Sequence, residues 1–179
     1  MLYNDRFIHR YTAQLDRLTP GSDYNYQVGS TEKGIWTELN NFQTEAVNTE
    51  HFTYVWFGDT HCFPDSGKLV NLAADKNRDA VFYSIAGDNV STGLYRDDWD
   101  KLFQYGGRTF ANRPLMPVLG NHDRQDGLGA QLYYDLFSLP ENGPAAVEPE
   151  ASYSFEYGNA LFIMIDATSD VDDHTAWIE

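Results

Sequence analysis

Phe52-Thr-Tyr-Val-Trp-Phe-Gly-Asp-Thr-His61 is the stretch on which the predicted fold depends: an apolar, aromatic run stops at a glycine and then presents a carboxylate and an imidazole. Residues 54–57 have the composition and length of a strand that is covered on both faces, and Gly58 lets the backbone turn where the strand ends. Ligands of an open α/β sheet bind beyond the carboxyl ends of its strands, so Asp59 and His61 are candidate metal ligands. Taken alone, the stretch is better explained as a polar turn in which Asp59 caps a helix.

The same kind of ending occurs twice more in the chain. Ala86-Gly-Asp-Asn-Val90 follows the apolar run 80–86, and Leu119-Gly-Asn-His-Asp123 follows the apolar run 115–119. The endings are separated by about 30 residues, the length of a βαβ unit, and helical stretches are predicted between them at 68–77 and 95–105. Such alternation builds a parallel sheet with right-handed crossovers, so the three endings would meet at one edge. Each aspartate singly is better explained as a turn or helix cap, but together the endings favour a functional site.

The composition is that of an acidic globular protein. A chain of 179 residues with 42% hydrophobic residues can form one full domain or parts of two. Because 12 basic residues face 27 acidic ones, the net charge is −15, which argues against sequence-independent binding to nucleic acid. An acidic protein that acts on phosphates needs a local source of positive charge, and bound metal ions would provide it.

The only cysteine, Cys62, excludes an intramolecular disulfide and is best interpreted as a small packed residue. The chain shows no charged leader followed by an apolar stretch, and no run near the roughly 18 apolar residues of a membrane span. We therefore expect neither a nucleic-acid nor a membrane partner, and the sequence leaves the oligomeric state open.

The first 46 residues differ in pattern from the rest. Apolar and polar residues alternate in the manner of strands at 7–15, 24–28, 35–39 and 42–44, with turn-forming residues between these runs. So few strands leave one apolar face without a partner sheet, which is typical of part of a β-sandwich. The polar stretch 45–50 is the predicted boundary, and the predicted domains are residues 1–46 and 47–179.

The last 50 residues read as short elements joined by polar loops. We expect a short helix at 133–137, an acidic loop at 140–150 and a hairpin formed by residues 152–157 and 160–165. The acidic cluster from Asp166 to Asp173 lacks the glycine and distal glutamate of a calcium loop, so we interpret it as a solvated loop. It leads into a helix at 174–178, and the chain stops one turn into that helix.

The three endings, read as Gly-Asp-x-His, Gly-Asp-x-x and Gly-Asn-His-Asp, resemble the first three sequence blocks of the calcineurin-like metallophosphoesterases. The resemblance implies the N-terminal part of an α/β/β/α metallophosphoesterase sandwich, preceded by a partial antiparallel β-sandwich. It also implies a metal-ligand set in which Asp59 and His61 hold one ion, Asp88 bridges two ions and Asn121 binds the second.

Two further residues receive roles from the same resemblance. His122 would stand near the scissile phosphate as a proton donor or transition-state stabiliser, and Asp123 would orient His122. Upstream, residues 7–44 look like the end of the fibronectin type III-like domain of purple acid phosphatases. Ser91 stands where those enzymes carry an iron-binding tyrosine, so the ligand set is similar to the general metallophosphoesterase type. The family's later histidine blocks have no counterpart here, and His9, His51 and His174 are interpreted as surface or packing residues.

The activity implied is hydrolysis of a phosphomonoester or phosphodiester by a hydroxide that two divalent or mixed-valence ions activate. Fe, Mn, Zn or Mg are the candidate ions, and a small-molecule or peptide-borne phosphate ester is the expected substrate. The family analogy suggests a secreted or periplasmic protein. The alternative is a non-catalytic fragment or binding module with an incomplete metal site. A nucleotide-binding α/β domain is disfavoured, because no glycine-rich phosphate loop follows any of the three strands.

Overall fold

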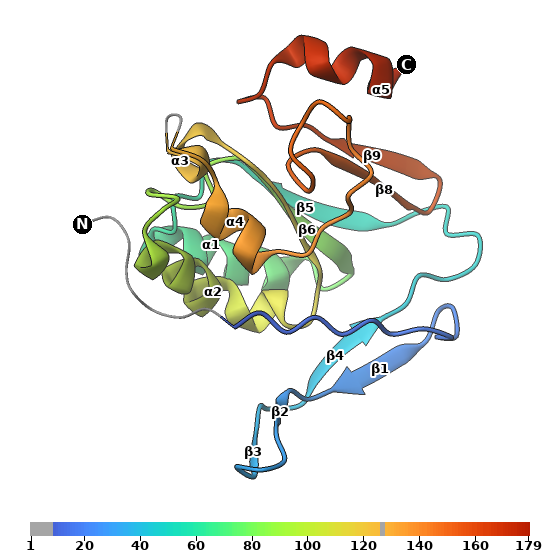
Figure 1. Cartoon of the computed structure of the whole chain (residues 1–179). Coiled ribbons are helices and arrows are strands. Elements are labelled where there is room, and N and C mark those ends of the chain that lie inside the picture. The colour runs from blue at the N-terminus through green and yellow to red at the C-terminus, as the bar shows by residue number, and fades with distance from the viewer. Residues whose placement is uncertain (1–8, 126–127) are drawn as a thin grey trace.

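A three-stranded parallel sheet forms the centre of the molecule (Figure 1). The computed structural model describes residues 9–125 and 128–179. The sheet has the order β5-β6-β7, with β5 at Thr53–Phe57, β6 at Ala80–Ala86 and β7 at Leu115–Val118. Both strand pairs are parallel, so the three carboxyl ends point to the same edge. The parallel sheet predicted from the alternating pattern is confirmed.

Two helices make the crossovers between these strands and lie side by side (Figure 1). The first, α1, spans Pro64–Lys76, and the second, α2, spans Arg96–Phe110. Proline suits the first turn of a helix, because its ring fixes φ and no hydrogen bond is needed there, which explains why α1 begins at Pro64. The predicted helices at 68–77 and 95–105 are confirmed, with α1 beginning earlier and α2 ending later than expected.

An aromatic core packs behind the carboxyl edge of the sheet. Trp99 from α2 and Tyr133 from α4 (Gln131–Leu136) are both 0% exposed, and their ring centroids lie 6.3 Å apart. Phe137 completes the group at 5.9 Å from Trp99. Leu102 of α2 is also buried, so this face of the helix packs against the core.

The expectation that residues 54–57 are covered on both faces is wrong. Trp56 is 67% exposed and Tyr54 is 43% exposed. The strand β5 lies at the edge of the sheet. The face of β5 that carries Tyr54 and Trp56 is covered only in part, by the hairpin of β8 (Tyr153–Tyr157) and β9 (Ala160–Met164). Phe162 of that hairpin meets Tyr54 at a ring-centroid distance of 5.2 Å. The predicted hairpin itself is confirmed.

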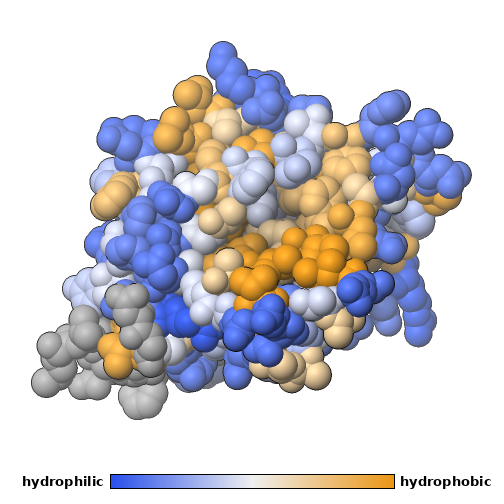
Figure 2. All heavy atoms as spheres, turned by 90° about the horizontal axis from the view of Figure 1, so that it is seen from above, coloured by the Kyte–Doolittle hydropathy of each residue, from blue (hydrophilic) through white to orange (hydrophobic). Residues whose placement is uncertain are grey.

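Apolar side chains gather in one area of the face seen from above, with hydrophilic residues at its border (Figure 2). Exposed apolar residues of the hairpin include Leu161 at 59% and Ile163 at 39%. No helix among residues 9–125 and 128–179 has the length and apolar character needed to cross a membrane.

The N-terminal region forms two small antiparallel ribbons. Strand β1 (Asp23–Tyr26) pairs with β4 (Asn40–Gln43), and β2 (Gly29–Ser30) pairs with β3 (Ile35–Trp36). Residues 9–15 form no strand, which corrects the prediction for the described part of 7–15; residues 7 and 8 lie outside the described residues. The Tyr26 hydroxyl donates to the Ala111 carbonyl at 2.5 Å, which ties β1 to the end of α2. The division into domains at residue 46 stays a prediction.

Three short helices complete the chain: α3 at Asn121–Arg124, the 3-10 helix η1 at Val171–His174 and α5 at Thr175–Ile178. The prediction of a solvated loop from Asp166 to Asp173 is wrong for its first residue. Asp170, Asp172 and Asp173 are exposed, but Asp166 is 0% exposed. Its carboxylate is buried because Arg124 and two hydroxyl groups supply hydrogen bonds to it.

Candidate metal centre

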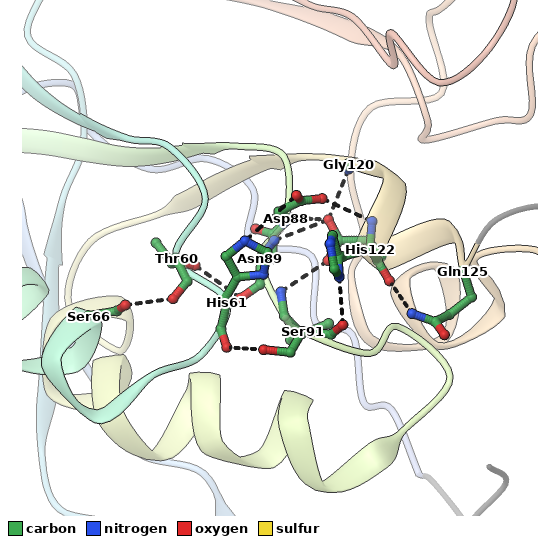
Figure 3. Close-up of polar contacts among 11 residues, drawn as sticks. Thr60, His61, Ser66, Asp88, Asn89, Ser91, Gly120, His122 and Gln125 are labelled. Carbon is green, nitrogen blue, oxygen red and sulfur yellow. Dashed lines mark hydrogen bonds and ion pairs between the residues drawn. The ribbon is translucent and has the colours of Figure 1, made fainter.

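The three strand endings meet at one point, as their pattern predicts, and Asp88 lies at the centre of that meeting (Figure 3). The backbone N–H of His61, from the ending of β5, donates to the Asp88 carbonyl at 2.9 Å. The backbone N–H of His122, from the ending of β7, donates to Oδ1 of Asp88 at 2.9 Å. Asp88 is 9% exposed and is therefore held by both neighbouring loops.

The backbone at this meeting point is unusual. Asp59, His61 and Asp88 have φ angles of 45°, 47° and 49°, in the left-handed region that non-glycine residues rarely adopt. Such conformations cost free energy and cluster at functional sites, where the surrounding structure imposes them. At Gly120 a Cβ atom would lie 2.2 Å from both the backbone nitrogen and Oδ1 of Asp88, so only glycine lets the end of β7 approach so closely.

Three side chains form a compact group of potential metal ligands: His61, Asp88 and His122. One ligand atom from each lies within 4.8 Å of the others. Nε2 of His61 is 3.8 Å from Oδ2 of Asp88, and the two imidazole rings stand nearly perpendicular with centroids 4.8 Å apart. Two imidazoles and one carboxylate make a donor set that suits Zn, Mn or Fe.

Ser91 links the two histidines. Its carbonyl oxygen lies 2.8 Å from Nδ1 of His122, and its hydroxyl donates to the His61 carbonyl at 2.8 Å (Figure 3). A carbonyl only accepts, so Nδ1 of His122 carries a proton. The sequence drew attention to Ser91 only as a replacement for tyrosine. Its contact with His122 uses a backbone carbonyl, which every residue has, so no sequence signal could have found it.

Asp59 and Asn121 share a cavity with Asp88. All three residues line a cavity of about 620 Å³, together with Gly87, Gly120, Leu119, Ala86, Arg124, Ala167 and Thr168. Asp59 and Asn121 are exposed. Asp59 is not a member of the group that His61, Asp88 and His122 form within 4.8 Å. The structure thus places the other three predicted metal ligands near Asp88, but gathers only His61 and Asp88 with His122 into one compact group.

Asp123 is a fully buried residue whose carboxylate joins the endings of β6 and β7 by hydrogen bonds. Its Oδ2 accepts hydrogen bonds from the backbone and side-chain nitrogens of Asn89 at 3.1 and 2.9 Å and from the Gly120 N–H at 2.9 Å. Its Oδ1 accepts from the Val90 N–H at 3.1 Å. Burial raises the pKa of Asp123, and these hydrogen bonds oppose that rise. Asp123 therefore acts on the loop that carries His122, while Nδ1 of the ring meets Ser91.

Arg124 and Asp166 form an ion pair beside the cavity that was not predicted from the sequence. Nε of Arg124 also donates to the Thr168 hydroxyl at 2.7 Å. Burial acts to raise the pKa of Asp166, but hydrogen bonds from Thr168 and Ser169 and the charge of Arg124 outweigh it and leave the pKa lowered. A signal was available, because Asp166 follows the apolar run 160–165 just as the other acidic residues follow their strands.

The residues interpreted as structural have the expected surroundings. Cys62 is 5% exposed, and burial raises the pKa of its thiol. His174 is 1% exposed, with its Nε2 2.9 Å from the Ser152 hydroxyl, so it is a packing residue. His9 and His51 are exposed.

The calcineurin-like phosphoesterase family model matches residues 52–172, about two thirds of the chain. The chain belongs to this family.

The curated relatives of this chain are distant in sequence. An uncharacterized protein of Mycobacterium tuberculosis is 25% identical over 181 residues, which cover 86% of this chain and 32% of that protein. Probable inactive purple acid phosphatase 1 of Arabidopsis thaliana is 28% identical over 192 residues, covering 92% of this chain and 31% of the relative. The chain thus spans about a third of the length of these relatives.

The fold is similar to that of a solved purple acid phosphatase. PPD1, isolated from yellow lupin (Lupinus luteus) seeds, superimposes with a TM-score of 0.68 at 20% identity, covering 83% of this chain and 31% of that chain. At this identity the likeness shows the fold alone. The predicted mixed α/β architecture is therefore confirmed, whereas the fibronectin type III-like character of the N-terminal region stays a prediction.

The residues of this chain fit the metal chemistry of its family. Members typically bind divalent metal ions, and the carboxylate of Asp88 with the imidazoles of His61 and His122 could hold one. The left-handed backbone at Asp59, His61 and Asp88 is of the kind that clusters at functional sites. The number and identity of the ions remain a matter of proposal.

Proposed function

We propose that this protein is a metal-dependent phosphoesterase that hydrolyses a phosphomonoester or phosphodiester. The observation that supports it best is the position of Asp88, whose carboxylate lies within 4.8 Å of a ligand nitrogen of each of two imidazoles and whose residue lines a cavity of about 620 Å³. A site of this kind brings acidic side chains into an open cavity, where they would repel a phosphate unless cations were bound. Family membership supplies the same chemistry independently.

In this proposal Asp59 and His61 hold one ion, Asp88 is shared, and Asn121 holds a second. Two bound ions would supply a nucleophile at neutral pH and neutralise charge on the phosphoryl oxygens. The protein's own part is to orient these groups. The His122 N–H donates to the Asp88 carboxylate, and the His61 N–H donates to the Asp88 backbone carbonyl. Both the side chain and the backbone of Asp88 are therefore held in place, so that little reorganisation accompanies the reaction.

His122 is proposed to donate a proton to the leaving-group oxygen through Nε2. Its Nδ1 donates to the Ser91 carbonyl, so the transferred proton would be the one that Nε2 carries in the imidazolium form. Asp123 would keep the loop of His122 in register with the ending of β6. A small-molecule or peptide-borne phosphate ester is the proposed substrate, because a net charge of −15 disfavours a polyanionic one.

A second candidate function is metal binding without hydrolysis. Two of the plant relatives carry the word inactive in their names, and the compact group contains His122 in place of Asp59. If His122 binds the ion, it cannot also donate a proton to a leaving group.

The test compares the wild type with Asp88→Asn, which keeps the shape of the side chain but removes its charge. Metal content and hydrolysis of p-nitrophenyl phosphate and bis(p-nitrophenyl) phosphate are measured with Mn, Zn or Fe added. We expect the substitution to lower metal affinity and turnover by about 100-fold or more. Asp172→Asn, an exposed aspartate, is the control for charge and should leave both unchanged.

Undiminished turnover in Asp88→Asn would refute the proposed function. Metal that binds stoichiometrically to a wild type without hydrolytic activity would favour the second candidate.

A further inference from the structure

Arg124 is a basic residue that lines the cavity of about 620 Å³ beside Asp88, in a strongly acidic chain. It shares this cavity with the carboxylates of Asp59 and Asp88. It ends the short helix α3, directly after the third strand ending, and its side chain is 25% exposed. Arginine stays charged at every physiological pH, so it adds a permanent positive charge beside two acidic groups.

The guanidinium of Arg124 is held from one side. Nε donates to the Thr168 hydroxyl at 2.7 Å, and Nη2 pairs with the carboxylate of Asp166. Asp166 is itself anchored, because its carboxylate accepts hydrogen bonds from the Thr168 N–H at 2.9 Å and the Ser169 hydroxyl at 2.7 Å. The orientation of the arginine is therefore set by a buried, well-bonded carboxylate before any ligand arrives.

One nitrogen of the Arg124 guanidinium, Nη1, takes no part in these contacts. Arginine has five N–H donors. Nε and Nη2 meet Thr168, Asp166 and the Tyr134 hydroxyl, the last at 3.5 Å. Within the part of the chain that the structure describes, no protein group accepts a hydrogen bond from Nη1. These donors belong to a residue that lines the cavity, so they are available to a ligand inside it.

We propose that Arg124 is a substrate-binding residue, whose Nη1 donates hydrogen bonds to a non-bridging oxygen of the substrate's phosphoryl group. This inference rests on the proposed phosphoesterase function. Guanidinium groups bind phosphate oxygens by charge-assisted hydrogen bonds, and a group fixed in advance loses little conformational entropy on binding. A phosphomonoester carries one more negative charge than a diester near neutral pH, so Arg124 favours monoesters.

The competing explanation is that Arg124 only neutralises the buried Asp166. In that case its loss would lower stability but would not change phosphate binding by the protein that remains folded. The two explanations therefore predict different effects of losing Arg124 on the binding constant for phosphate, but the same effect on thermal stability.

The experiment uses Arg124→Met, Arg124→Lys and a matched control, Arg96→Met. Arg96 is a suitable control, because its side chain is 22% exposed and its Nε donates to Asp100 at 2.8 Å, but it lies on α2 and does not line the cavity. For each protein we measure metal content, KM and kcat for both nitrophenyl esters, and the inhibition constant of inorganic phosphate. Phosphate binding to the metal-loaded protein is also measured by calorimetry.

With Arg124→Met we expect KM for the monoester and the inhibition constant of phosphate to rise about tenfold or more, and KM for the diester to rise less. Metal content should stay unchanged, and Arg96→Met should match the wild type. Arg124→Lys should recover part of the affinity for phosphate, because it keeps the positive charge but lacks the planar set of N–H donors. If Arg124→Met does not fold, the lysine variant serves for the same comparison.

An active enzyme whose phosphate constants are the same in all variants would overturn the inference and leave the proposed function intact. If the wild type shows no hydrolysis, the proposed function fails, and calorimetry decides the inference separately. Phosphate binding that depends on Arg124 would then support it, whereas binding that is absent or independent of Arg124 would overturn it.

Discussion

Residues that hold the loops together are as important at this site as the candidate ligands. Asp123 accepts four hydrogen bonds from the endings of β6 and β7, and three of the donors are backbone N–H groups. Ser91 contacts His122 through a backbone carbonyl. A buried backbone group without a partner costs free energy, so these contacts fix the loops firmly. The positions of His61 and His122 follow from this framework.

Asp166 should make stability depend on pH in acid. Its folded-state pKa is lowered, so its contribution is present above the unfolded-state value of about 3.9 and is lost as pH falls through the folded-state value. We expect Asp166→Asn to cost about 2 kcal/mol or more at pH 7, because it weakens a buried ion pair. The difference from the wild type should begin to shrink below about pH 4, where the carboxyl of the unfolded chain takes up a proton, and should be lost once the pH falls through the lowered folded-state pKa.

Urea unfolding of both proteins at pH 7, 5, 4 and 3 would measure this difference. Asp172→Asn makes the same charge change at an exposed site and should cost no more than about 0.5 kcal/mol at any of these pH values. A stability difference between wild type and Asp166→Asn that stays constant from pH 7 to pH 3 would contradict the assignment.

At the scale of elements, the strand endings work because glycines remove side chains where backbones come close. The Gly120 position touches Asp88 so tightly that any Cβ would displace its carboxylate. The contact between α1 and α2 also requires a glycine, because a Cβ at Gly67 would lie 2.3 Å from Cβ of Tyr105. Nearby, the Asn71 side chain donates to the Tyr105 carbonyl at 2.9 Å and fastens the two helices.

Two glycines in these helices should respond oppositely to alanine. Gly67→Ala should destabilise the protein by about 1–3 kcal/mol, because it forces α1 away from Tyr105. Gly107→Ala in α2 should stabilise it by about 0.5–1 kcal/mol, because a Cβ there meets nothing within 4 Å and alanine is the better helix former. Denaturant midpoints of the two variants measure both effects. If both substitutions changed the free energy of unfolding in the same direction, the contact between α1 and α2 would be looser than the structure indicates.

At the scale of the whole molecule, charge is the dominant feature. A net charge of −15 over 179 residues repels itself in the compact state, and salt screens this repulsion. We expect the unfolding temperature of the metal-free protein to rise by several degrees between about 10 mM and 150 mM NaCl, where the Debye length falls from roughly 30 to 8 Å.

Differential scanning fluorimetry with a chelator present measures this rise. Asp16→Asn combined with Asp172→Asn lowers the charge at two exposed sites and should make the salt effect smaller. A melting temperature that does not change with salt, or a larger effect in the double variant, would refute the explanation by self-repulsion.

The predictable parts of this molecule were those set by local pattern. The strands 80–86 and 115–119, the two crossover helices and the hairpin at 152–165 each have a period and a terminator that can be read in the chain. Two of the incorrect expectations, the coverage of Trp56 and the exposure of Asp166, concern which partner covers a side chain. Partners far apart in sequence decide that, as when Arg124 pairs with Asp166.

The sequence by itself determined the order of strands and helices, the glycine at each strand ending and the acidic, amide and imidazole groups that follow. These depend on interactions among neighbours in the chain, so periodicity and turn residues reveal them. Only the tertiary structure decided that His61, Asp88 and His122 come within 4.8 Å, that Ser91 contacts His122 and that Arg124 lines the cavity. Distances between residues on separate strands depend on sheet register, loop conformation and packing, which act together and are not written in any one segment.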